Sequence, residues 1–157
     1  MLIEAAISAR HDRRLRAAGA VEPPGDVYRA MAVVYPASFV VMIAEGVLRG
    51  AASDVWWQSG LAIFVLAKAL KYWAIASLGS RWTFRVLVPP GSTRTRRGPY
   101  RWLRHPNYVA VAGELAGVGV AMHAVISGPA SLLAFGYLMI LRVRVEEVAL
   151  RRHHEVG

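Results

Sequence analysis

Two polar stretches of this chain carry side chains that suit a small polar ligand. The first, 98–108, reads Gly-Pro-Tyr-Arg-Trp-Leu-Arg-His-Pro-Asn-Tyr and stands directly before an apolar segment. It offers cations and aromatic rings, and Pro106 favours the start of a helix with His105 near its N-cap. Free backbone amides at such a start favour carboxylates and phosphates. The second stretch, 142–147, reads Arg-Val-Arg-Val-Glu-Glu and follows another apolar segment.

Glu114 is a third candidate because it lies inside an apolar segment. It follows Asn107 by seven residues, so both side chains project from nearly the same helix face. Helical rise places Glu114 about 10 Å into the segment. A carboxylate at that depth is paired, protonated or in contact with water, and ionisable groups within a membrane are functional candidates. Glu114 is therefore either a functional carboxylate or a structural partner of Lys68 or Lys71.

The second polar stretch also has a simpler interpretation. Arg142 and Glu146 have the four-residue spacing, and Arg144 and Glu147 the three-residue spacing, of ion pairs on a helix surface. Exposed pairs of this kind contribute only about 0.3–0.5 kcal/mol each. The functional interpretation depends on whether the fold brings this helix end to the same side of the membrane as His105.

The elements that must position these residues are apolar helices. Hydrophobic residues make up 55% of the chain and the mean hydropathy is +0.36, which is more apolar than a typical soluble domain. A membrane-spanning helix needs about 20 mostly apolar residues. Four segments come near that length: 27–48, 56–78, 107–126 and 129–143. Gly128-Pro129 is expected to join the last two as a hairpin, with Pro129 at the helix start.

The sequence thus predicts an all-α, polytopic integral membrane bundle, in one domain of residues 1–157, with about four spans and an N-terminal helical piece. Arginines precede the first span, fill the 79–106 loop and follow the last span, whereas only Arg49 lies on the other side. Positive-inside counting therefore predicts a folded cytoplasmic loop and cytoplasmic N- and C-termini. The arginine-rich composition favours a bacterial inner membrane. Lys68 and Lys71 are then expected to extend toward the cytoplasmic interface.

Composition argues against several other classes. The net charge is +9, but the basic residues lie between apolar segments rather than on one soluble face, so no nucleic-acid partner is expected. The absence of cysteine excludes disulfides, thiolate zinc sites and a cysteine nucleophile. His153 and His154 point to different helix faces with no third ligand cluster nearby, so no metal site is expected.

The polar motifs together resemble the isoprenylcysteine carboxyl methyltransferase family. The resemblance rests on Gly98-Pro99-Tyr100, Arg104-His105-Pro106-Asn107-Tyr108, a hairpin, and Arg142 with Glu146-Glu147. The chain also resembles the bacterial branch that O-methylates alkylpyrones and alkylresorcinols, through Arg81-Trp82-Thr83 and residues 13–22. The Arg-His-Pro-x-Tyr string alone also occurs in phospholipid N-methyltransferases and membrane sterol reductases.

This resemblance implies S-adenosylmethionine as cofactor and a lipophilic small molecule or prenylated substrate that enters from the bilayer. The implied cofactor-binding residues are Thr93, Arg94, Thr95, Tyr100, His105, Pro106, Asn107, Tyr108 and Glu146. The candidate catalytic residues are Arg142, Glu146 and Glu114, and Arg142 is expected to face the substrate. A carboxylate acceptor needs no base, whereas a hydroxyl needs one, for which Glu114, His105 and Glu146 are candidates.

Two alternatives remain at this level. A membrane reductase that uses NADPH shares the Arg-His-Pro-Asn-Tyr string, although Glu146 and Glu147 would repel its phosphates. The second alternative is a non-catalytic membrane protein whose basic loop binds membrane lipids through Arg94, Arg96 and Arg97.

Overall fold

The computed structural model describes residues 2–20, 22, 25–85, 87 and 96–155. All regular structure within these residues is helical, which confirms the predicted all-α class. The five α-helices are α1 (Leu2–Ala17), α2 (Tyr28–Leu48), α3 (Val55–Leu78), α4 (Pro106–Ala121) and α5 (Ser127–Glu155), and two short 3-10 helices are η1 (Gly79–Arg81) and η2 (Gly98–Arg101).

Three stretches within the described residues are helical, long and apolar enough to cross a bilayer: Tyr28–Leu48, Val55–Arg81 and Ser127–Val148. They confirm a membrane helical bundle. The expected third span, 107–126, is a shorter helix: α4 ends at Ala121 and has 16 residues. At 1.5 Å per residue it is about 24 Å long, less than the bilayer core.

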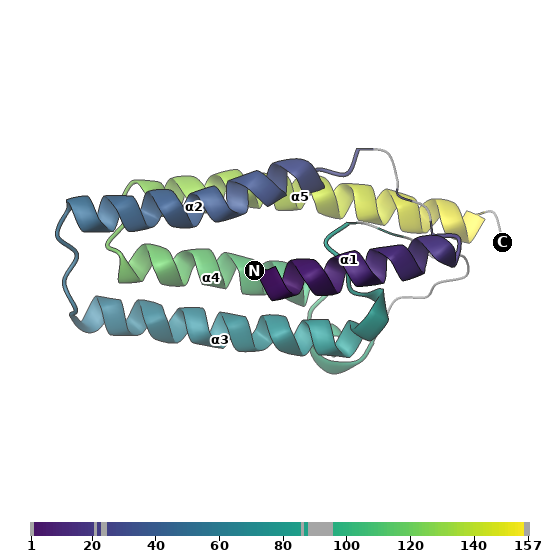
Figure 1. The fold of residues 1–157 in the computed structure, drawn as a ribbon, viewed down its shortest axis with the longest axis horizontal. Helices are drawn as coiled ribbons and strands as arrows, with labels where there is room; N and C mark the ends of the chain where they lie inside the picture. The colour runs from purple at the N-terminus through teal and green to yellow at the C-terminus, as the bar shows by residue number, and fades with distance from the viewer. Residues whose placement is uncertain (1, 21, 23–24, 86, 88–95, 156–157) are drawn as a thin grey trace.

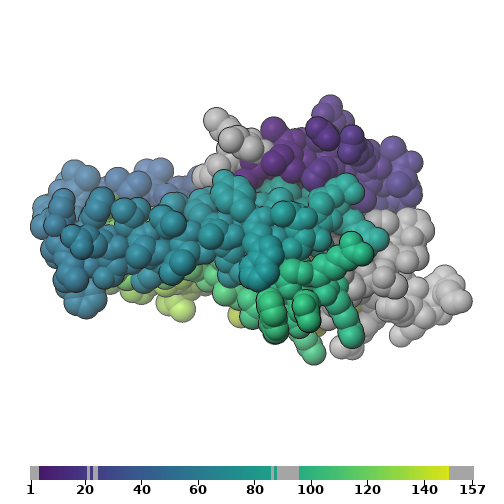
Figure 2. Space-filling view, turned by 90° about the horizontal axis from the view of Figure 1, so that it is seen from below, coloured from purple at the N-terminus to yellow at the C-terminus, as the bar shows by residue number. Residues whose placement is uncertain are grey.

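Helices α2 to α5 run side by side along the long axis of the molecule, with α4 between α3 and the α2–α5 pair (Figure 1). Buried side chains of α2, α4 and α5, among them Met42, Leu115 and Phe135, form the apolar core. Helix α1 covers only one half of the bundle. Figure 2 shows it on one side of the end of α3, with the chain that follows residue 96 on the other. This end holds every polar stretch that the sequence singled out.

Helices α3 and α4 touch through glycines. A Cβ on Gly117 would lie 2.7 Å from the Phe64 nitrogen and 2.8 Å from the Gly60 oxygen, and one on Gly113 would lie 2.9 Å from the Ala67 Cβ. Only glycine allows the backbones to approach this closely, as the small-residue spacing of Gly113 and Gly117 predicts.

The turn between α4 and α5 differs from the prediction. It spans 122–126, and α5 starts at Ser127 rather than at Pro129. The reason is a remote cap: a Glu45 oxygen accepts from the Ser127 nitrogen at 2.7 Å and the other from the Ile126 nitrogen at 3.2 Å. This carboxylate on α2 satisfies amides at the helix start that would otherwise lack partners.

Candidate active site

The start of α4 and the last third of α5 meet at one carboxylate. Pro106 is the first residue of α4 and His105 is its N-cap, as predicted. The His105 ring stacks on Tyr108, with centroids 5.3 Å apart. Oε2 of Glu146 lies 3.8 Å from Nδ1 of His105 and accepts from the Tyr108 hydroxyl at 3.4 Å. The fold therefore brings the two predicted polar stretches together.

Tyr100 lies on η2, and its hydroxyl interacts electrostatically with the same carboxylate. Burial and the negative charge of Glu146 raise the pKa of the Tyr100 hydroxyl above its ordinary value, so it stays a neutral donor. The backbone before it is fixed by Gly98, whose φ is +55° and whose missing Cβ would lie 2.0 Å from Oγ of Ser77. Glycine alone suits this left-handed, crowded position.

At the start of α4, two buried polar atoms have no hydrogen-bond partner among the described residues, namely Nε2 of His105 and Oδ1 of Asn107. An unpaired buried polar atom is costly, and native structures contain few of them. Asn107 directly precedes Tyr108 in the first turn of α4. These atoms fit a polar ligand that carries a donor for the amide oxygen and a partner for the imidazole.

Arg142 is buried and pairs with groups other than Glu146. Its Nη1 lies 3.7 Å from Oδ1 of Asp26, and its Nη2 donates to the Phe84 carbonyl. The ion pair predicted between Arg142 and Glu146 is wrong for this part of the chain, because the buried guanidinium takes the buried carboxylate of Asp26 as its partner. The Arg144–Glu147 pair is also absent from the ion pairs of the described residues, and Arg144 is exposed.

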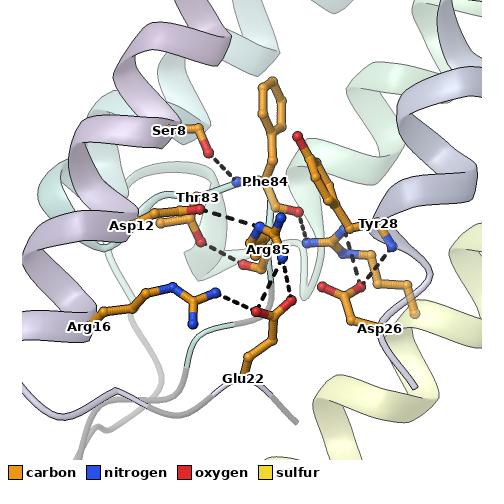
Figure 3. A network of polar contacts seen from close by, with 10 residues as sticks. Ser8, Asp12, Arg16, Glu22, Asp26, Tyr28, Thr83, Phe84 and Arg85 are labelled. Atoms are coloured by element: carbon orange, nitrogen blue, oxygen red, sulfur yellow. Dashed lines mark hydrogen bonds and ion pairs between the residues drawn. The ribbon is translucent and has the colours of Figure 1, made fainter. Parts of the chain in front are cut away.

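A polar network holds the Phe84 segment in place (Figure 3). The Phe84 nitrogen donates to Oγ of Ser8 on α1 at 2.8 Å. Arg85 donates to Glu22 at 2.8 Å and lies 3.7 Å from Asp12. Burial alone would raise the pKa of Glu22, but hydrogen bonds from the guanidinium groups of Arg16 and Arg85 hold it below its ordinary value. Residues 13–22 and 81–83 carry the resemblance to the bacterial branch, and they are thus connected in space through Arg85, which follows the second stretch.

Glu114 lies in a separate buried cluster. Its carboxylate accepts from the Tyr35 hydroxyl and lies 3.3 Å from Nζ of Lys68 and 3.5 Å from Nζ of Lys71. Glu4 of α1 completes the cluster, 3.0 Å from Lys71. The structural interpretation of Glu114 as a lysine partner is therefore confirmed. Lys71 does not extend to the interface as expected, because its ammonium finds two carboxylates inside the bundle.

Three predicted cofactor residues, Thr93, Arg94 and Thr95, lie outside the described residues, as do the side chains of His153 and His154. Within the described part, no group of three or more His, Asp or Glu residues could hold a metal ion. Sequence reasoning missed Asp26, Glu4 and Tyr35. Asp26 had a local signal, since a carboxylate that accepts from the Tyr28 nitrogen at 3.1 Å is typical of a helix start.

Comparison with known proteins gives one family. The model of the isoprenylcysteine carboxyl methyltransferase (ICMT) family matches residues 60–152, more than half of the chain. A Bacillus subtilis (strain 168) relative, named as the uncharacterized protein YpbQ, is 28% identical over 96% of this chain and 89% of its own length. An uncharacterized Haemophilus influenzae protein is 26% identical over 92% of this chain and 84% of its own. No solved structure matches significantly.

Proposed function

We propose, since the chain belongs to the isoprenylcysteine carboxyl methyltransferase family, that it is an integral-membrane, S-adenosylmethionine-dependent enzyme that O-methylates a lipophilic acceptor. The observation that carries this proposal is the position of Glu146 against His105 and Tyr108. A carboxylate beside aromatic rings suits a sulfonium or ammonium cation, whereas the phosphates of NADPH would be repelled.

The cofactor, when bound, supplies an electrophilic methyl group. Glu146 would hold its cationic part, and the α4 start with its free amides would favour its carboxylate. Asn107 and Tyr100 would add polar contacts, and the rings of His105 and Tyr108 would exclude water. The remaining implied residues are Pro106, whose side chain is fully buried, and Thr93 to Thr95.

Arg142 would orient the acceptor oxygen, which enters laterally from the bilayer. In-line methyl transfer depends mainly on holding donor and acceptor in place. A prenylated carboxylate needs no proton removal, whereas a polyketide-type hydroxyl needs a base. We favour His105 for this base, because its Nε2 is free among the described residues, whereas Glu114 is fully buried and held by two lysines. A polyketide-type acceptor agrees with the bacterial-branch resemblance.

Calorimetry with S-adenosylhomocysteine on the detergent-solubilised protein tests this function. We expect saturable binding that weakens about tenfold in Glu146→Gln, since hydrogen bonds to charged groups are among the stronger ones, and that is unchanged in Glu147→Gln. Absence of binding to the wild-type protein would overturn the proposal. Binding of NADPH instead would favour the reductase, and binding only to vesicles of anionic lipid would favour a non-catalytic role.

The proposed site lies on the cytoplasmic side of a bacterial inner membrane, together with both termini. The arginine distribution supports this orientation. Reporter fusions at Ser53 and Gly128 test it, because both positions are expected outside the cytoplasm. Cytoplasmic reporter activity at either position would invert the model.

A further inference from the structure

We infer that Asp26 is a positioning residue for Arg142, through which the N-terminal part of the chain completes the acceptor side of the active site. The inference rests on the proposed function, in which Arg142 faces the acceptor. Asp26 lies two residues before the start of α2 and Arg142 lies on α5, so the pair joins the entry to one helix with another, at the end of the bundle that holds Glu146.

The burial of both groups makes the pair obligatory. The side chains of Arg142 and Asp26 are only 8% and 4% exposed, and Nη1 lies 3.7 Å from Oδ1. A buried guanidinium without a counter-charge is strongly unfavourable, so removing one partner costs far more than replacing both. Asp26 therefore determines whether the charged guanidinium of Arg142 can stay where it lies.

The two terminal nitrogens of the Arg142 guanidinium, Nη1 and Nη2, have partners, whereas Nε has none among the described residues. Nη1 lies against Asp26 and 3.8 Å from the Met31 sulfur, and Nη2 donates to the Phe84 carbonyl. Nε is buried and has no hydrogen-bond partner among the described residues. Arginine never acts as an acceptor and stays charged. Nε is thus the position where a carboxylate or phenolate oxygen of the acceptor would find a cationic donor.

Two of the partners of Arg142, Asp26 and Met31, come from a part of the chain that the family match does not include. The match begins at residue 60, whereas Asp26 and Met31 precede it. The Phe84 carbonyl is itself fixed by Ser8 of α1 and by the stacking of Tyr28 on the Phe84 ring, at 6.2 Å between centroids. Both relatives align with more than nine tenths of this chain. The N-terminal part is then an element of the acceptor site, beyond its role in packing.

A double-mutant cycle tests the inference in the full-length solubilised protein. The probes are a 5-alkylresorcinol and an S-farnesylated N-acetylcysteine, titrated by calorimetry with S-adenosylhomocysteine at saturation. Asp26→Asn keeps an oxygen for the Tyr28 nitrogen but removes the charge. We expect it to weaken binding of the preferred probe about tenfold, to leave the Kd of S-adenosylhomocysteine within about twofold, and to have no further effect in an Arg142→Lys background.

Two further variants separate positioning from stability. Asp26→Glu keeps the charge and is expected to bind the probe within about threefold of the wild type. Asp54→Asn is the matched control. Like Asp26, Asp54 accepts from the backbone nitrogen two residues later, here that of Trp56 at 3.0 Å, but it lies at the other end of the bundle. We expect no change in probe binding there. Equal losses in Asp54→Asn and Asp26→Asn, or failure of Asp26→Glu to bind, would overturn the inference.

The remaining outcomes are also decisive. Losses in Asp26→Asn and Arg142→Lys that multiply would show that Asp26 does not act through Arg142. If the wild type binds S-adenosylhomocysteine but holds neither probe more tightly than Arg142→Lys does, this inference fails while the cofactor site stands. If the wild type binds no S-adenosylhomocysteine, the proposed function fails first and the inference with it.

Discussion

The ammonium of Lys71 lies 3.0 Å from the carboxylate of Glu4, and each side chain is at most 2% exposed. This contact joins α1 to the membrane-spanning α3. Since Lys71 also faces Glu114, one cation neutralises carboxylates from two other helices. The arrangement makes α1 an integral part of the bundle. It also predicts which substitutions weaken the attachment of α1.

Lys71→Ala is expected to destabilise the protein by about 3–5 kcal/mol, because it leaves two buried carboxylates with Lys68 as their remaining cation. Thermal unfolding in detergent measures the loss. Adding Glu4→Gln should recover part of it, since one uncompensated charge is removed. Arg10→Ala changes an exposed cation of α1 and serves as control. A Lys71→Ala protein with the same unfolding temperature as the wild type would contradict a stabilising role of the ion cluster.

The stability contributed by Glu22 should depend on pH. Its pKa is lowered in the folded protein, so its contribution is present above the ordinary value of 4.5 and is lost as the pH falls through that value toward the folded one. Glu22→Gln is therefore expected to lower the unfolding temperature at pH 7. The free-energy loss should be about 1 kcal/mol or less, because the side chain is a quarter exposed.

The same substitution should have progressively less effect below pH 4.5. Unfolding of wild type and Glu22→Gln followed from pH 7 to pH 3 checks this sign. Arg85→Gln should reduce the difference between them at pH 7, because Arg85 is one of the two guanidinium groups that donate to Glu22, at 2.8 Å. A Glu22→Gln effect that grows as the pH falls would contradict the assignment.

The elements were predictable where the signal is local. Apolar run length gave three spans, Pro106 gave the start of α4, and the spacing of Gly113 and Gly117 gave the contact with α3. The start of α5 was not predictable in this way, because its cap comes from Glu45 on a distant helix. Helix starts fixed by remote side chains have no neighbouring sequence signal.

The site was predictable to a similar extent. Motif residues His105, Tyr108 and Glu146 meet as the topology requires. The partner of Arg142 was mispredicted, because spacing rules consider only neighbours on one helix, whereas the rotation of α5 turns this side chain toward Asp26. Burial then decides between the candidate partners, and burial depends on the assembled bundle.

The contact between α3 and α4 predicts a contrast between two glycines. Gly117→Ala should be strongly destabilising, because the new Cβ would meet the α3 backbone at 2.7 Å. Gly136→Ala on α5 meets nothing within 4 Å and should be neutral or stabilising by up to about 1 kcal/mol, since alanine favours the helix. Unfolding temperatures of the two variants measure the contrast. Equal behaviour would contradict the close packing of the two helices.

Tyr108→Phe is expected to weaken S-adenosylhomocysteine binding about fivefold, because it removes the hydroxyl that donates to Glu146 and leaves the ring stacked on His105. The control is Tyr137→Phe, an exposed tyrosine on α5, which should bind as the wild type does. In a Glu146→Gln background the loss from Tyr108→Phe should shrink, because the two groups act through one contact. Losses that multiply in the double variant would mean that Tyr108 touches the ligand independently of Glu146.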